Sequence, residues 1–314
     1  MSFTPAARPT MYFIGVTTGS SAIRRVFPLW AEALGIPEAD LVGIDLAPGS
    51  PAEAYREVVS WIARDELSVG ALVTTHKIDL YLACRDLFVG FNPDAVALEE
   101  VSCIAKRPAG LLGMATDPVS VGLALDAFLP SGHWQRTGAA ALLLGAGGSA
   151  TALMCHLAAE ERGAARPERI VATSRRAERL EKIRRVHELR GLSVPLETRR
   201  ADGPSANDAA LAGLPPGSLV VNATGLGKDA PGSPLTNAAE FPMRGLAWDF
   251  NYRGDLIFLE QARLQQAGRG LRLEDGWVYF IHGWTRVIAE VFQLDVPTAG
   301  PAFDRLATMA EVVR

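Results

Sequence analysis

The sequence predicts an α/β fold of two domains, each built around a mainly parallel sheet. Three observations indicate it. Short β-type runs alternate with helical segments along most of the chain. A helical stretch and a linker near residues 118–138 divide this alternation into two series, and the last two helical segments are followed by no strand. Because parallel strands need a long crossover connection, usually a helix, such alternation is typical of parallel sheets.

The first series runs from residue 12 to about residue 115. Its expected strands and helices are MYFIGV, LVGIDL, GALVTT and short runs near 99–104 and 111–114, with helices near 22–34 and 51–65. Asp117 and Pro118 then open an apolar helix, because proline suits the first helical position, where its missing N–H has no partner to lose. The linker PSGHWQRTG follows this helix and indicates a domain boundary.

The second series forms another doubly wound unit. Its expected strands and helices are AALLL, ERIVATS, LSVPLETRR, SLVVNATG and GLAWDF, with helices near 149–162 and 177–190. The tail segments GWVYFIHGWTRVIAEVF and PAFDRLATMAEVVR read as helices, and we expect them to pack back on the first domain. The predicted domains are therefore 1–117 with 278–314, and 118–277.

The composition narrows the class of protein. With 314 residues, 48% hydrophobic and 21% charged, the chain has enough apolar residues for two cores, and its net charge of −4 gives no basic surface for nucleic acid. Three cysteines without CxxC spacing indicate neither a disulfide framework nor a metal site. No apolar run reaches 18 residues and no leader is visible, so we expect a cytoplasmic protein without membrane spans.

A glycine-rich turn predicts a dinucleotide site in the second domain. The strand ALLL runs directly into Gly145, Ala146, Gly147, Gly148, Ser149 and Ala150, and then into a helix. Glycines let the backbone approach a pyrophosphate, and the helix N-terminus supplies N–H donors for it. A tight turn between packed elements is the simpler alternative, but the order of strand, turn and helix favours a Rossmann-type nucleotide-binding domain.

The next expected strand ends in residues that favour NADP over NAD. Ser174, Arg175 and Arg176 stand where an NAD-binding domain has an acidic residue for the ribose 2′-hydroxyl. Guanidinium groups suit a 2′-phosphate because their donors match phosphate oxygens. Alternatively, the two arginines only begin a solvated helix. A further run, Asn222-Ala223-Thr224-Gly225, leaves a buried strand where the nicotinamide ribose is expected.

The order of these motifs resembles the shikimate and quinate dehydrogenase family from about Tyr12 to Phe292. In chain order, the segments that carry the resemblance are Gly15 to Ser21, VTTHK ending in Lys77, GMATD ending in Asp117, the turn at 145–150, Ser174-Arg175-Arg176, Asn222-Ala223-Thr224, DFNY ending in Tyr252, and the helix after Gly276. The resemblance implies an oxidoreductase in which Lys77 and Asp117 are the catalytic pair. Hydride cannot leave a carbinol carbon unless the hydroxyl proton also leaves, and a lysine beside a carboxylate can relay that proton.

The departures from the family pattern concentrate in the expected substrate pocket. Of two carboxylate-binding serines, Ser21 remains and Ile23 replaces the other. Family asparagines fall near Ala71 or Leu72, at Ser102 and at Ala115, and a glutamine falls at Gly283. The proline expected before Lys77 is also missing. Each unmet polar group on a buried ligand costs about 1–3 kcal/mol, so these changes disfavour shikimate as the substrate.

Five residues remain as candidates for contact with the substrate. They are Ser21, His76, Ser102, Tyr252 and His282. For each histidine a structural role in the core is the alternative. Lys77 has the alternative of a solvated helix entry, and Asp117 that of a helix cap, which is compatible with catalysis.

The sequence therefore predicts an NADP-dependent dehydrogenase acting on a secondary alcohol or ketone of a small cyclic hydroxy acid, which we expect not to be shikimate itself. Two alternatives stay open: a genuine shikimate or quinate dehydrogenase with substituted contacts, and a non-catalytic NADP-binding regulatory protein. Folate dehydrogenases share the two-domain order but fit Asp117 and the DFNY segment less well. The expected partner is a small molecule, with no metal, and a homodimer is compatible with the sequence.

Overall fold

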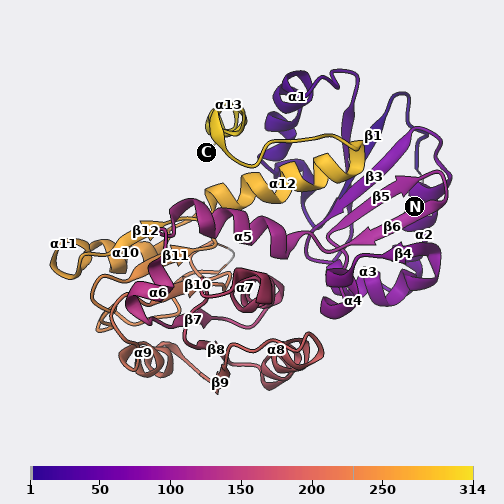
Figure 1. Cartoon of the computed structure of the whole chain (residues 1–314). Helices are drawn as coiled ribbons and strands as arrows, with labels where there is room; N and C mark the ends of the chain where they lie inside the picture. The colour runs from indigo at the N-terminus through magenta and orange to yellow at the C-terminus, as the bar shows by residue number, and fades with distance from the viewer. Residues whose placement is uncertain (1–2, 229, 314) are drawn as a thin grey trace. The chain divides into compact units, whose positions relative to one another are not determined.

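The computed structural model describes residues 3–228 and 230–313, which divide into two compact units (Figure 1). Unit 1 comprises the chain up to Asp117 together with the segment from Ile281 onward, and unit 2 runs from Pro118 to Phe280. The second boundary thus lies inside a helix, slightly beyond the 277/278 division expected from the sequence. The predicted α/β fold with two domains is confirmed.

Unit 1 is built on a six-stranded mixed sheet. Its strands are β1 (Thr10–Gly15), β2 (Asp40–Asp45), β3 (Ser68–Val73), β4 (Phe88–Phe91), β5 (Cys103–Arg107) and β6 (Gly110–Met114), in the order β2-β1-β3-β5-β6-β4. β1 is parallel to β2 and β3, whereas β5 is antiparallel to both of its neighbours, β3 and β6. The carboxyl end of β3 and the end of β6 therefore lie on neighbouring parts of the sheet, separated by β5, which runs the other way.

The helices of unit 1 cover this sheet and include the C-terminal end of the chain. They are α1 (Ile23–Ala33), α2 (Ala52–Arg64), α3 (Lys77–Cys84), α4 (Pro93–Leu98), the part of α12 (Trp277–Phe292) that follows Phe280, and α13 (Gly300–Glu311), with short 3-10 turns at Thr18–Ser20 and Arg85–Leu87. α13 packs against α1, where the indole N–H of Trp30 donates to the carbonyl oxygen of Leu306 at 2.8 Å. The C-terminal helices thus return to the N-terminal domain, as expected.

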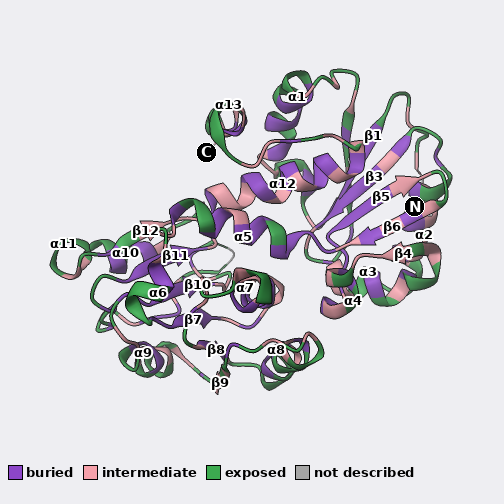
Figure 2. Ribbon diagram, in the orientation of Figure 1, coloured by how far each residue is buried: buried purple, intermediate pink, exposed green. Residues whose placement is uncertain are grey.

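Unit 2 contains a six-stranded, fully parallel sheet. Its strands are β7 (Ala141–Leu144), β8 (Ile170–Ser174), β9 (Leu196–Arg200), β10 (Leu219–Asn222), β11 (Leu246–Asp249) and β12 (Arg272–Glu274), in the order β12-β11-β10-β7-β8-β9. The strand order reverses between β7 and β10, which is the Rossmann arrangement. Every residue of β7, β10 and β11 is buried (Figure 2). Ligands of such sheets bind at the carboxyl ends of the strands beside this reversal.

The helices of unit 2 connect these strands. They are α5 (Asp117–Phe128), whose first residue belongs to unit 1, α6 (His133–Thr137), α7 (Gly148–Ala158), α8 (Ala177–Leu189), α9 (Pro204–Ala212), α10 (Ile257–Arg263), α11 (Gln266–Arg269) and the first turn of α12, with a 3-10 turn at Glu160–Arg162. The segment expected to be a linker after α5 contains α6, so it is partly helical. No helix among the described residues is both long enough and apolar enough to cross a membrane.

Candidate active site and nucleotide pocket

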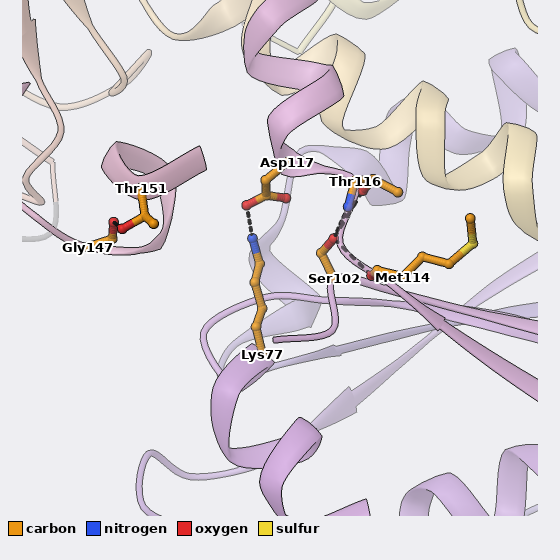
Figure 3. Close-up of polar contacts among 7 residues, drawn as sticks. All are labelled: Lys77, Ser102, Met114, Thr116, Asp117, Gly147 and Thr151. Carbon is orange, nitrogen blue, oxygen red and sulfur yellow. Dashed lines mark hydrogen bonds and ion pairs between the residues drawn. The ribbon is translucent and has the colours of Figure 1, made fainter. Parts of the chain in front are cut away.

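Lys77 and Asp117 form an ion pair in unit 1 (Figure 3). Lys77 is the first residue of α3, shortly after the end of β3, and Asp117 is the first residue of α5, shortly after the end of β6. The lysine Nζ contacts Oδ2 of the carboxylate, and the two side chains are 22% and 11% exposed. Two residues forty positions apart are thus joined by the topology of the sheet.

The surroundings of Lys77 keep it protonated. Burial by itself would lower the pKa of the ammonium, but the charges of Asp117 and then Glu100 outweigh burial, and the pKa of Lys77 lies above its usual value. At neutral pH the side chain is therefore an ammonium ion that hydrogen-bonds a carboxylate. Such a group can donate a proton to an oxygen or stabilise negative charge on it.

A strained residue lies in the turn before this lysine, where the family pattern has a proline. Thr75 has a φ of 58°, in the left-handed region that β-branched residues rarely adopt. On either side of it the backbone is held: the N–H of Thr74 donates to Ile14 at 2.9 Å, and the N–H of Val101 donates to the carbonyl of Lys77 at 3.0 Å. These hydrogen bonds hold the turn before Lys77 in its strained conformation.

Ser102 organises the segment that leads into Asp117 (Figure 3). Its hydroxyl oxygen accepts the backbone N–H of Thr116 at 2.8 Å and lies 3.0 Å from the Thr116 hydroxyl. Ser102 is 3% exposed, so these partners occupy a side chain that the resemblance placed in the substrate pocket. The adjacent Ala115 is fully buried, and both of its backbone groups bond to the side chain of Asn92. Sequence reasoning missed Asn92, which also caps α4.

His76 lies in the core of unit 1 rather than on an open surface. It is 1% exposed, its Nε2 is 3.0 Å from the carbonyl oxygen of Leu46, and its Nδ1 is 3.0 Å from the hydroxyl of Tyr55. Because a carbonyl oxygen only accepts, Nε2 carries a proton. This geometry favours the structural role that the sequence left open for His76.

The other three substrate candidates lie in different surroundings. His282 is 1% exposed, and its ring stacks on Phe303 with centroids 4.4 Å apart, which also favours a structural role. Burial and then Arg286 lower the pKa of His282 to about 4. Ser21 follows the Thr18–Ser20 turn and is half-buried. Tyr252 belongs to unit 2, where its ring packs against Trp277 and Phe280.

A pocket of about 470 Å³ lies at the carboxyl ends of the strands of unit 2. Predicted cofactor residues from all three segments line it: Gly145, Ala146, Gly147, Ser174, Arg175, Arg176, Ala223, Thr224 and Gly225. The remaining four predicted residues, Gly148, Ser149, Ala150 and Asn222, are not among its lining residues. The first three of these begin α7, whose N-terminus therefore adjoins the pocket.

Gly145 allows the strand ends around this pocket to approach each other. Its φ of 116° is accessible to glycine, and a Cβ at this position would lie 2.8 Å from the carbonyl oxygen of Ala223. Asn222 supports the neighbouring turn. It is fully buried, accepts the Thr224 hydroxyl at 2.6 Å, and donates to Asp249 at 3.0 Å. Burial raises the pKa of Asp249 to about 6, despite hydrogen bonds from Asn222 and Asn251 that lower it.

The charge of the pocket fits an anionic ligand. Three arginines line it: Arg175, Arg176 and Arg179, the last of which was not among the predicted cofactor residues. The Arg179 guanidinium reaches the glycine turn, since its Nη1 lies 3.1 Å from the position of a Cβ at Gly147. Arg179 lies in the first turn of α8, whereas Arg175 and Arg176 precede this helix. Asp202 is the one acid among the described lining residues, and Arg200 pairs with it at 2.9 Å.

Comparisons with known proteins show one similar sequence and several similar folds. No protein-family model matches the chain. Its sequence is 27% identical over 278 residues to shikimate dehydrogenase (NADP(+)) of Methylobacterium radiotolerans, and the match covers 88% of each chain.

Two solved structures illustrate the fold. Shikimate 5-dehydrogenase from Thermus thermophilus, in complex with NADP(H) and shikimate, superposes with a TM-score of 0.70 at 22% identity, over 97% of this chain and 99% of that one. The ligand-free 5-ketofructose reductase of a Gluconobacter species gives 0.68 at 19% identity, over 98% and 99%. The resemblance predicted from the order of motifs is confirmed.

Proposed function

We propose, from the sequence similarity and fold shared with the shikimate dehydrogenases, that this chain is an NADP-dependent dehydrogenase. It would transfer hydride between NADP(H) and a secondary alcohol or ketone. The observation that carries the proposal is the ion pair of Lys77 with Asp117, because a protein that only sensed NADP would need no proton relay. In this proposal unit 1 holds the substrate and unit 2 holds NADP.

The protein's part of the reaction is to manage one proton. NADP⁺ bound in the pocket of unit 2 would supply the acceptor for the hydride that leaves the carbinol carbon. The hydroxyl proton passes to the Lys77–Asp117 pair, so that the alcohol becomes a ketone and the charges balance. In the reverse direction the Lys77 ammonium donates a proton to the oxygen that the reduction leaves negative. Because the pair titrates as one system, the base is not assigned to either residue.

The charge of the nucleotide pocket supports NADP as the cofactor. Arg175, Arg176 and Arg179 supply guanidinium donors, while Ser174 at the end of β8 leaves no carboxylate where a 2′-phosphate would be repelled. The N-terminus of α7, reached through Gly147, is suited to the pyrophosphate.

We further infer that the substrate is a small cyclic hydroxy acid other than shikimate. The hydroxyl of Ser102 is engaged by Thr116, and Ile23 is fully buried at the start of α1, so neither supplies a substrate contact. At Gly283, where the family pattern has a glutamine, an added Cβ would meet no other atom within 4 Å, so no neighbouring side chain fills the place of the missing one. The burial of His76 weighs against the alternative that it replaces lost contacts to shikimate.

A substrate panel tests both parts of this proposal. The protein is incubated with NADP⁺ and hydroxy acids that include shikimate and quinate, and NADPH absorbance is followed. We expect turnover of a cyclic hydroxy acid and little turnover of shikimate. Rapid shikimate oxidation would overturn the inference about the pocket, and tight NADPH binding without turnover of any compound would favour a regulatory protein. The cytoplasmic location and the homodimer remain predictions from the sequence.

A further inference from the structure

A buried carboxylate that the reaction above does not use lies beside the proton relay. Glu100 is 2% exposed, in the loop between α4 and β5. The residue before it, Glu99, has a φ of 52°, and this left-handed residue ends α4 and turns the chain inward. The residue after it, Val101, donates its N–H to the carbonyl of Lys77 at 3.0 Å. The backbone therefore ties the Glu100 loop directly to the first residue of α3.

A carboxylate in such a place needs a compensating charge. Burial of an ionised carboxylate is costly unless a cation or strong hydrogen bonds stabilise it. Lys77 is the cation whose pKa the charge of Glu100 raises, second only to Asp117. Asp117 acts from the start of α5, and Glu100 acts from the loop after α4.

Two other titratable groups near Lys77 are directed elsewhere. His76 contacts Tyr55 of α2, and Asp79 of α3 raises the pKa of the same tyrosine, after the larger effect of burial. The charges that act on Lys77 therefore come from two segments. Asp117 begins α5 after the end of β6, and Glu100 lies in the loop before β5.

We propose that Glu100 is a positioning residue of the proton relay, a second carboxylate that acts with Asp117 to hold Lys77 in place as an ammonium ion. The proposal rests on the function proposed for Lys77. It makes the relay a cluster of one cation and two carboxylates rather than a neutral pair. The three groups then titrate together, and the lysine releases its proton only at a pH well above neutrality.

The charge state of Lys77 can be measured without any substrate. The chain has four lysines, so ¹³C-lysine labelling gives four side-chain signals, and Lys77→Arg identifies the one from Lys77. In the wild type we expect Lys77 to titrate above the ordinary lysine pKa of about 10.4. In Glu100→Gln, which keeps the shape and removes the charge, we expect this pKa to fall by about one unit. The matched control is Glu99→Gln, one residue earlier, which should leave it unchanged.

Kinetics give a second readout. With NADPH and the ketone product of a hydroxy acid that reacts in the panel, the decline in rate at alkaline pH should begin about one pH unit lower in Glu100→Gln than in Glu99→Gln. Glu100→Asp should restore part of the shift, and the KM for NADPH should not change.

The proposal and the proposed function fail in different ways. If Glu100→Gln lowers the melting temperature but moves neither the Lys77 titration nor the pH profile, Glu100 is merely structural and the inference is overturned. If that variant does not fold, a wild-type Lys77 that titrates at or below about 10.4 overturns it equally. If the titration shifts as expected but no alcohol or ketone reacts, the positioning role stands and the dehydrogenase proposal fails.

Discussion

A buried lysine paired with a carboxylate differs from a solvated lysine in what it can do for a substrate oxygen. Lys77 is largely buried, and its ammonium charge is kept by Asp117. The pair thus has a fixed geometry before a substrate arrives, and little reorganisation is needed when charge develops on an oxygen. Single-residue changes here should affect turnover far more than they affect the fold.

Replacing Lys77 tests its role directly. Lys77→Ala should lower kcat by about 10²–10⁴-fold, the usual contribution of a positioned acid or base, with little change in NADPH affinity. Steady-state kinetics and a fluorescence titration of NADPH measure the two effects. The control is Lys106→Ala, since Lys106 bonds the backbone of Asp65 and takes no part in the pair. Turnover retained in Lys77→Ala would mean that the proton relay lies elsewhere.

The arginines of the nucleotide pocket allow a second single-residue test. The double variant Arg175→Ala, Arg176→Ala should raise the KM for NADP⁺ by about 10²- to 10⁴-fold, because it removes two charge-assisted hydrogen bonds that each contribute about 1.5–3 kcal/mol. The KM for NAD⁺ should hardly change. Arg166→Ala is the control, because Arg166 is only partly buried and bonds Ser193 outside the pocket. Equal effects on both cofactors would remove the argument from the 2′-phosphate.

At the scale of elements, the turn from β7 to α7 depends on the close approach of two strand ends. Gly145→Ala would place a methyl group 2.8 Å from the Ala223 oxygen at a φ of 116°. We expect a loss of more than about 1 kcal/mol in stability and weaker NADPH binding, measured by thermal unfolding and titration. Gly191→Ala is the matched control, with a φ of 59° and open space around the new carbon. Similar losses in both variants would show that backbone strain alone, and not the strand contact, is responsible.

The elements that the sequence predicted well are those with a strong apolar period. Five of the six parallel strands of unit 2, β7 to β11, and helices such as α2 and α8 were found close to their observed bounds. β4 and β12 were missed because they are short edge strands whose residues are only partly buried or exposed, so they carry no continuous apolar run. The antiparallel position of β5 was also not predicted, since pairing direction is set by the partner strands.

In the candidate site, too, the residues marked by local sequence patterns were predicted, and those defined by distant contacts were not. Lys77, Asp117 and the glycine turn have motifs that place them, whereas the burial of His76 and His282 depends on Tyr55 and Phe303, which are distant in sequence. Glu100 was missed for a related reason: a glutamate in a loop carries no mark of its burial in a single sequence. Contacts across the fold, which local patterns do not record, decide these roles.

At the scale of the whole molecule, two buried groups give the units opposite responses to pH. His282 of unit 1 has a folded pKa of about 4, below its ordinary 6.5, so between these values only the unfolded chain binds the proton. Its contribution is present above pH 6.5 and is lost as the pH falls toward 4. Asp249 of unit 2 has a folded pKa of about 6, above its ordinary 3.8, so its contribution is lost as the pH rises from 3.8 to 6.

Calorimetry between about pH 7 and pH 4 should reveal this opposition. Each group shifts the free energy of unfolding by about 3 kcal/mol over its window, an order-of-magnitude value from the size of the two pKa changes. His282→Gln should remove the loss of stability of unit 1 as the pH falls from 6.5 to 4. Asp249→Asn should remove the loss of stability of unit 2 as the pH rises from 3.8 to 6. Identical pH profiles in wild type and both variants would contradict the assignment of these groups.

The packing of α13 on α1 has a consequence for how the polypeptide is made. On the ribosome, residues 118–280 are complete while unit 1 still lacks its final helices, because the Trp30 contact requires Leu306, which is synthesised later. Domains generally fold as units during synthesis, so the Rossmann unit should mature first although it comes second in the chain. A chain truncated after Phe280 should therefore resist protease within unit 2 and be cleaved within residues 3–117, whereas the full chain should resist cleavage in both units.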